Sequence, residues 1–180
     1  MVQKMFHLIQ LLLHGHNSSM PHAVPGNRRI KEGDIILLDF GCKYKGYCSD
    51  MTRTIFVEYI EEEYKEAYEL VKELNEYAIN EFKDGTNLKN ITKDINEKIK
   101  ENRYAVMHSP GHGVGLEVHE QPFYTTNVDS IIKENMILTI EPGVYIPGDF
   151  GVRIEDTVWV NRSNAISLTK SDKGYVVIEG

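Results

Sequence analysis

Four acidic residues of this 180-residue chain stand inside segments that otherwise consist of apolar, strand-forming residues. They are Asp39 in ILLDFG, Asp50 in YCSDMT, Glu141 in LTIEPG and Glu155 in VRIEDT. An ionised carboxylate in a buried strand is costly unless a cation or hydrogen bonds compensate it. A single acid of this kind is commonly a buried turn residue. Four acids need more positive charge, and the two nearby candidates, Arg53 and Arg153, are too few to neutralise them. The pattern therefore favours divalent metal ions, and four carboxylates suit two ions with bridging ligands better than one.

One histidine is placed to supply a nitrogen ligand. His112 stands between two glycines in GHGVGLEVHE, residues 111–120. Because glycine has no Cβ, the flanking backbone can approach another segment closely. Oxygen ligands with one imidazole suit Mn, Co, Zn or Fe(II). His7, His14 and His16 match no ligand position, and we interpret them as structural or solvated.

The first two acids fall in a predicted β-hairpin. Residues 35–57 contain two runs rich in β-branched and aromatic residues, separated by a turn-like KYKG. A four-residue loop would place Cys42 opposite Tyr47 and Asp39 opposite Asp50. Since cross-strand partners have Cβ atoms about 5 Å apart on one face, this register brings the two carboxylates together.

Two amphipathic helices and a second set of strands are predicted after the hairpin. The elements are a helix from Glu61 to Phe82, a helix from Leu88 to Arg103 capped by Thr86 or Asn87, and strands around residues 136–142, 144–160 and 174–179. Residues 136–160 resemble residues 35–57 as a carboxylate-bearing hairpin. This similarity suggests an internal duplication in which the first half lacks its helix pair.

The composition predicts one domain, residues 1–180, because 41% apolar residues suffice for a sizeable core. A net charge of −7 with scattered lysines and arginines argues against nucleic-acid binding. No segment approaches the roughly 20 apolar residues of a membrane span. Cys42 and Cys48 do not make a disulfide framework, so a reducing, cytoplasmic location is expected. We interpret Cys48 as a core thiol.

Four segments, in order, resemble the catalytic domain of the pita-bread metallopeptidases, which include prolidase, aminopeptidase P and methionine aminopeptidase. The segments are NSSMPHAVPGNRRIKEGDIILLDFGCKYKGYCSDMTRTIFV, HSPGHGVGLEVHE, ENMILTIEPGVYI and GVRIEDTVWV, and they span about residues 15–160. The resemblance implies an α+β pita-bread (creatinase/aminopeptidase) fold, a curved antiparallel sheet with helices on its outer face.

The resemblance also implies two divalent metal ions, with manganese the first choice and cobalt, zinc or Fe(II) as alternatives. Asp39 would bind one ion, Asp50 and Glu155 would bridge both, and His112 and Glu141 would bind the other. A water or hydroxide between the ions would be the nucleophile. Glu141 would also carry its proton to the leaving amine.

Further matches concern the substrate. By the same resemblance, His22 and His119 would contact the scissile peptide and stabilise the oxyanion, and His108 matches a substrate-side histidine of the proline-specific members. Arg153 and Tyr145 look like prolidase and aminopeptidase P. The implied reaction is hydrolysis of the bond preceding proline in a peptide, by an Xaa-Pro dipeptidase or aminopeptidase. That bond lacks an N–H and has a fixed φ, so it suits a dedicated pocket.

Alternatives stay open. A non-catalytic or remnant member of the family would keep the fold without peptide turnover. A methionine aminopeptidase is a further alternative, which Arg153 disfavours. Arg153 itself could merely form an ion pair with Asp156 or another acid. The match is strong only after Gly15, and the helix pair that normally precedes it is missing. We therefore expect an N-terminally truncated domain whose uncovered sheet face binds a second copy or a partner chain.

Overall fold

The structure is a computed structural model that describes residues 9–20 and 27–179. His22, one of the predicted substrate contacts, lies outside the described residues. So does His7.

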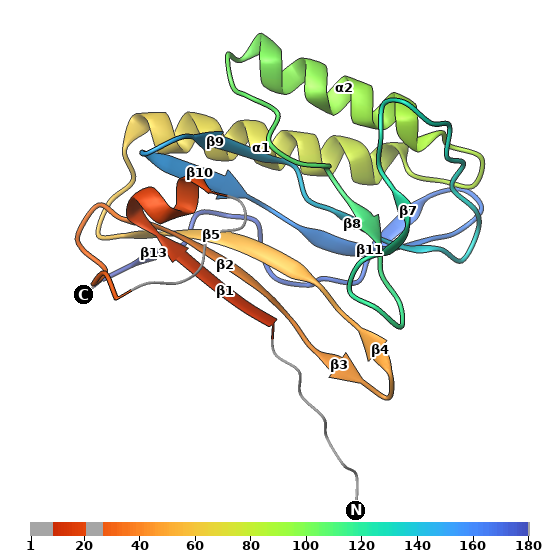
Figure 1. Cartoon of the computed structure of the whole chain (residues 1–180), viewed down its shortest axis with the longest axis horizontal. Helices are drawn as coiled ribbons and strands as arrows, with labels where there is room; N and C mark the ends of the chain where they lie inside the picture. Colours follow the sequence, from red (N-terminus) through yellow and green to blue (C-terminus); the bar gives the residue numbers. More distant parts are fainter. Residues whose placement is uncertain (1–8, 21–26, 180) are drawn as a thin grey trace, which may run out of the picture.

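A four-stranded sheet carries the predicted hairpin. Its strands, in spatial order, are β1 (Ile9–His14), β2 (Ile35–Gly41), β5 (Met51–Val57) and β13 (Val177–Ile178). β1, β2 and β5 pair antiparallel, whereas β13 pairs parallel to β5. The sheet is therefore antiparallel as expected except at this edge, where β13 near the end of the chain lies beside the early strand β5 (Figure 1).

The register of the hairpin differs from the prediction by two residues. Asp39 lies opposite Thr52, not Asp50. The hairpin continues through β3 (Lys43–Tyr44) and β4 (Tyr47–Cys48), in which Tyr44, not Cys42, lies opposite Tyr47. The turn is the two residues Lys45 and Gly46, with φ of 50° and 90°, as the tightest hairpin turns require. Because the shift is even, Asp39 and Asp50 still belong to one face.

The second sheet contains the segments that carry the other acids. Its order is β12 (Ala165–Ser167), β11 (Asp156–Val160), β8 (Ile137–Ile140), β6 (His112–Gly113) and β7 (Glu120–Phe123). A separate antiparallel pair, β9 (Gly143–Ile146) and β10 (Phe150–Arg153), connects β8 to β11. An isolated bridge between Thr52 and Glu155 joins the two sheets. This bridge lies at the centre of the candidate site.

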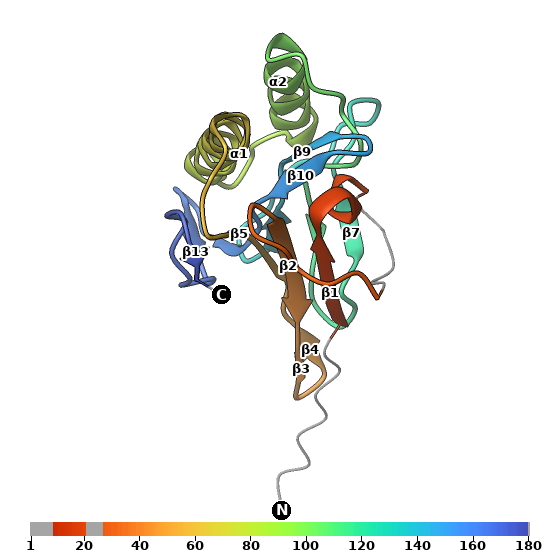
Figure 2. The same cartoon turned by 90° about the vertical axis from the view of Figure 1, so that its left-hand side faces the viewer.

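Both predicted helices are present and cover the same side of the strands (Figures 1 and 2). They are α1 (Glu62–Glu81) and α2 (Leu88–Glu101). α1 contacts β8, β9 and β10 and buries the apolar stripe that its spacing predicted. Of the two candidate caps for α2, Asn87 serves: its Oδ1 accepts a hydrogen bond of 3.1 Å from Lys89 N. Neither described helix has the length and apolarity that a membrane crossing requires.

Candidate metal centre

The five predicted ligands converge, although they come from both sheets. Asp39 is on β2, Asp50 immediately precedes β5, His112 is on β6, Glu141 immediately follows β8, and Glu155 lies between β10 and β11. They form two groups, Asp39–Asp50–Glu155 and His112–Glu141–Glu155. Within each group the potential ligand atoms lie within 4.8 Å of one another. Glu155 belongs to both groups, as a bridging ligand would.

The imidazole of His112 faces two of the carboxylates. Its Nε2 lies 3.4 Å from Glu141 Oε1 and 3.7 Å from Asp50 Oδ2. Nδ1 lies 2.9 Å from the carbonyl oxygen of Gly113, so Nδ1–H donates and the lone pair of Nε2 points toward the acids. Ligand bonds of about 2.1 Å at tetrahedral angles separate ligand atoms by about 3.4 Å. The His112–Glu141 distance therefore suits two ligands of one ion.

Glu155 shows most directly that the donor set fits a cation. Its carboxylate is buried; Oε2 accepts a hydrogen bond of 2.7 Å from Thr52 Oγ1. Among the described residues Oε1 has no hydrogen-bond partner. A buried carboxylate oxygen without a donor is costly, and a metal ion is the compensation that this cluster of oxygen and nitrogen ligands offers.

The two glycines beside His112 have the role that their positions suggested. A Cβ on Gly111 would lie 2.4 Å from the carbonyl oxygen of Thr139, and one on Gly113 would lie 2.3 Å from that of Gln121. The His112 amide donates to Thr139 Oγ1 at 3.1 Å. Close backbone contact on both sides therefore fixes the imidazole.

Burial, together with repulsion among the carboxylates, shifts the pKa values of the ligand side chains. Burial, with the Asp39 charge as second cause, raises the pKa of Asp50 to about 7. Burial raises the pKa of Glu141 to about 8, although the positive charge of Arg153 acts to lower it. Burial and the negative charge of Glu141 hold the pKa of Glu155 well above its usual range. Burial lowers the pKa of His112 to about 4. The neutral imidazole is the form that binds metals, whereas the carboxylates need a cation to stay ionised.

Arg153, Tyr145 and His108 form a hydrogen-bonded chain that ends at Asp39. Arg153 Nη2 donates to Asp39 Oδ2 at 2.5 Å, and Nη1 donates to the Tyr145 hydroxyl at 2.9 Å. That hydroxyl lies 2.9 Å from His108 Nε2. Arg153 thus pairs with Asp39 rather than with Asp156, whose arginine partner is Arg53.

The remaining histidine of the predicted site lies at the solvent-exposed edge of the cluster. The ring centroids of His119 and His112 are 4.3 Å apart. His119, His112 and Asp50 form a third potential ligand group. The sequence prediction missed Thr52, which donates to Glu155 and accepts from Arg153 Nε at 3.2 Å. Only its place two residues after Asp50 could have drawn attention to it.

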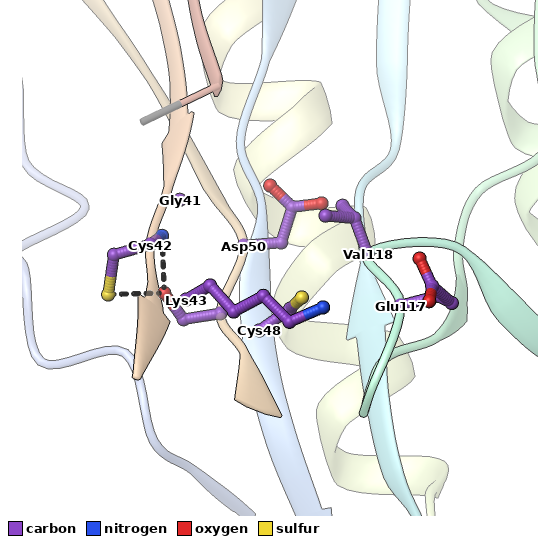
Figure 3. A pocket seen from close by; sticks show the side chains of 8 residues that line it. Gly41, Cys42, Lys43, Cys48, Asp50, Glu117 and Val118 are labelled. Carbon is purple, nitrogen blue, oxygen red and sulfur yellow. Dashed lines mark hydrogen bonds between the residues drawn. The ribbon is translucent and has the colours of Figure 1, made fainter. Parts of the chain in front are cut away.

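A cavity of about 260 Å³ adjoins Asp50, between the β3–β4 hairpin and the turn before His119 (Figure 3). Its lining includes Lys43, Cys48 and Val118. Cys48 is half-buried, and its Sγ donates to the carbonyl of Leu116 at 3.5 Å. The interpretation of Cys48 as a core thiol is therefore wrong. The side chain of Cys42 points away from Cys48 (Figure 3), and neither cysteine forms a disulfide.

Comparison with known proteins identifies the family. The profile of metallopeptidase family M24 matches residues 5–162. The chain belongs to this family, whose members bind divalent metal ions.

The relatives include proline-specific peptidases. The chain is 43% identical to the Xaa-Pro dipeptidase of Pyrococcus furiosus over 165 residues, which are 91% of this chain and 47% of that protein. The structure superposes on the prolidase of Thermococcus sibiricus with a TM-score of 0.91 and 38% identity, covering 94% of this chain and 47% of the other. For the X-Pro aminopeptidase of Thermotoga maritima the TM-score is 0.89, with 36% identity and coverage of 94% and 48%. The fold is thus the predicted pita-bread fold, and the chain spans about half the length of the curated relatives it matches.

Proposed function

We propose that this chain hydrolyses the peptide bond preceding proline, as an Xaa-Pro dipeptidase or aminopeptidase with two divalent ions. The observation that carries the proposal is the convergence of five ligand side chains in two groups that share Glu155, whose buried Oε1 has no hydrogen-bond partner among the described residues. Asp39 would hold one ion, His112 and Glu141 would hold the other, and Asp50 and Glu155 would bridge the two. Manganese is the ion to test first, followed by cobalt, zinc and Fe(II).

The bound ions would supply Lewis acidity, polarising the substrate carbonyl and lowering the pKa of a water molecule. Glu141 would accept a proton on its carboxylate and deliver it to the leaving amine nitrogen. His119 lies beside His112 at the edge of the cluster, where its ring could donate to the developing oxyanion. His22 would share that role.

The Arg153 chain would position these groups and select the substrate. Arg153 is 3% exposed, so we assign it to orienting Asp39 rather than to touching the peptide. The hydroxyl of Tyr145 contacts both Arg153 and His108 and would orient the His108 ring. That half-buried ring would contact the substrate. The cavity beside Asp50 would accept one side chain of the peptide.

We also propose that a second copy or a partner chain covers one face of the first sheet. Phe40 is 36% exposed there, and the half-buried Leu38, Met51 and Ile55 line a cavity of about 180 Å³ beside it. Apolar side chains gathered on one face are typical of an interaction surface.

Peptide assays test the proposed function and its alternatives. Purified protein loaded with Mn²⁺ should hydrolyse an Xaa-Pro dipeptide, a longer Xaa-Pro peptide, or both, and leave a Met-Ala peptide intact. Turnover of the Met-Ala peptide alone would instead identify a methionine aminopeptidase. Bound metal without turnover of any of the three peptides would identify a non-catalytic member.

A further inference from the structure

A second polar cluster, outside the five ligands, contacts the backbone on which Glu141 and Glu155 are carried. Its side chains are Arg53, Asn75, Asp156 and Lys173. Asn75 and Asp156 are at most 1% exposed, and Arg53 is 7% exposed. They come from β5, α1, β11 and the segment after β12.

Arg53 holds the bridge that joins the two sheets. Its Nη1 donates to the carbonyl of Thr52 at 2.9 Å and to the carbonyl of Glu155 at 2.7 Å. Its Nη2 donates to Asp156 Oδ1 at 2.7 Å. One rigid guanidinium therefore fixes a ligand residue, its hydrogen-bond donor Thr52 and the residue that follows the ligand.

Asn75 fixes the residues that precede two ligands. From α1, its Nδ2 donates to the carbonyl of Ile140 at 3.0 Å and to the carbonyl of Ile154 at 3.5 Å. Ile140 precedes Glu141 and Ile154 precedes Glu155. The amide thus sets the spacing between the two strand ends from which both carboxylates project.

Residues 171–174 complete this cluster from the end of the chain. Lys173 Nζ donates to Asn75 Oδ1 at 2.8 Å and to Asp156 Oδ2 at 3.0 Å. The carbonyls of Ser171 and Asp172 accept from Arg53 at 2.9 and 3.1 Å. The match to the family profile ends at residue 162, before this segment.

We propose that residues 171–174 are a clamp that raises the metal affinity of the centre, by holding Arg53 and Asn75 against the backbone of Glu141 and Glu155. The clamp residues are positioning residues, because none of them touches the potential ligand atoms. This inference rests on the proposed metal centre. It adds that the affinity depends on Lys173, a side chain that contributes no ligand.

Titration calorimetry with Mn²⁺ alone tests the clamp. Lys173→Met removes the donor and the charge with little change of volume, and Lys98→Met, at an exposed lysine paired with Glu101, is the matched control. Asn75→Leu has Asn96→Leu on α2 as its control. We expect the dissociation constant for Mn²⁺ to rise about 10- to 100-fold in the first member of each pair, the range that outer contacts of metal ligands show. The controls should bind as the wild type does.

Two further readouts separate positioning from general stability. The thermal midpoint of each metal-free variant shows that the protein is folded at the titration temperature. The double variant of Asn75 and Lys173 should bind Mn²⁺ about as weakly as the weaker single variant, since both act through one hydrogen-bonded unit. Lowered midpoints with unchanged dissociation constants would overturn the clamp alone. Wild-type protein that binds no Mn²⁺ would overturn the metal centre as well, whereas binding without peptide turnover would overturn only the proposed reaction.

Discussion

Thr52 and Glu155 bind each other through both backbone and side chain, across the junction of the two sheets. Glu155 N donates to Thr52 O at 3.0 Å, and Thr52 Oγ1 donates to Glu155 Oε2 at 2.7 Å. The other carboxylate oxygen, Oε1, has no donor among the described residues, and Glu155 belongs to two of the potential ligand groups. A neutral threonine thus aims a bridging carboxylate without neutralising its charge.

Replacing Thr52 by valine should weaken metal binding without unfolding the protein. Valine keeps the shape of threonine but removes the donor to Glu155, so the carboxylate loses its fixed orientation. We expect Mn²⁺ affinity to fall about 10- to 100-fold in a calorimetric titration. Thr92→Val is the matched control, because Thr92 is buried in α2 and donates to the carbonyl of Leu88. Equal Mn²⁺ affinities of the two variants would show that Thr52 does not orient Glu155 for metal binding.

Glu141→Gln should abolish most of the peptidase activity. The amide cannot carry the proton from water to the leaving amine, a loss of about 10²- to 10⁴-fold in kcat at saturating metal. One ion should also bind more weakly. Glu134→Gln, at a residue 4.0 Å from Arg162 at the surface, serves as the control. Near-normal kcat for Glu141→Gln would contradict the proposed role.

The metal-free protein should lose stability as the pH rises from about 6.5 to 8. Asp50 and Glu141 have folded-state pKa values of about 7 and about 8, above their unfolded values, so the folded state holds more protons in this range. Their stabilising contribution is complete below about pH 4 and is lost as the pH rises through the folded values. His112 acts oppositely, but only between its folded pKa of about 4 and its unfolded pKa of about 6.5.

Thermal melts in EDTA at pH 6.5, 7.2 and 8 measure this effect. Saturating Mn²⁺ should reverse the trend, since the ion displaces the same protons and binds more tightly as the pH rises. A metal-free midpoint that increases over this interval would show that the carboxyl groups are already ionised at pH 6.5.

Tyr145→Phe should separate the two ends of the Arg153 chain. The pair of Arg153 and Asp39 remains, whereas His108 loses its hydroxyl partner. We therefore expect an unchanged Mn²⁺ affinity but a lower kcat/KM on Xaa-Pro peptides, by about tenfold for one lost hydrogen bond. Tyr77→Phe, which removes a surface bond to Asp94, is the control. A tenfold change in Mn²⁺ affinity for Tyr145→Phe would place its hydroxyl in the metal centre instead.

Local patterns predicted most of the elements and ligands because each leaves a short-range signal. The helical spacing between Glu61 and Phe82 matches α1, and the acids stood out as charges within apolar strands. The hairpin register was wrong because KYKG permits both a four-residue and a two-residue loop. Positive φ at Lys45 and Gly46 decides between them, and sequence spacing does not report it.

Long-range contacts could not be predicted from the sequence. Lys173 meets Asn75 across 98 positions, and Arg53 meets Ser171 across 118. No periodicity or motif connects such residues. Residues 171–174 come just before β13, which pairs parallel with β5. The folded chain brings them beside Arg53 in this way, and the sequence carries no local signal for it.

Anomalous scattering from crystals loaded with Mn²⁺ would show where the ions bind and how many there are. The two-ion arrangement predicts two peaks, one beside Asp39 and the other beside His112 and Glu141, with Asp50 and Glu155 between them. A single peak held by Asp50, His112 and His119, or no peak near Glu155, would contradict it.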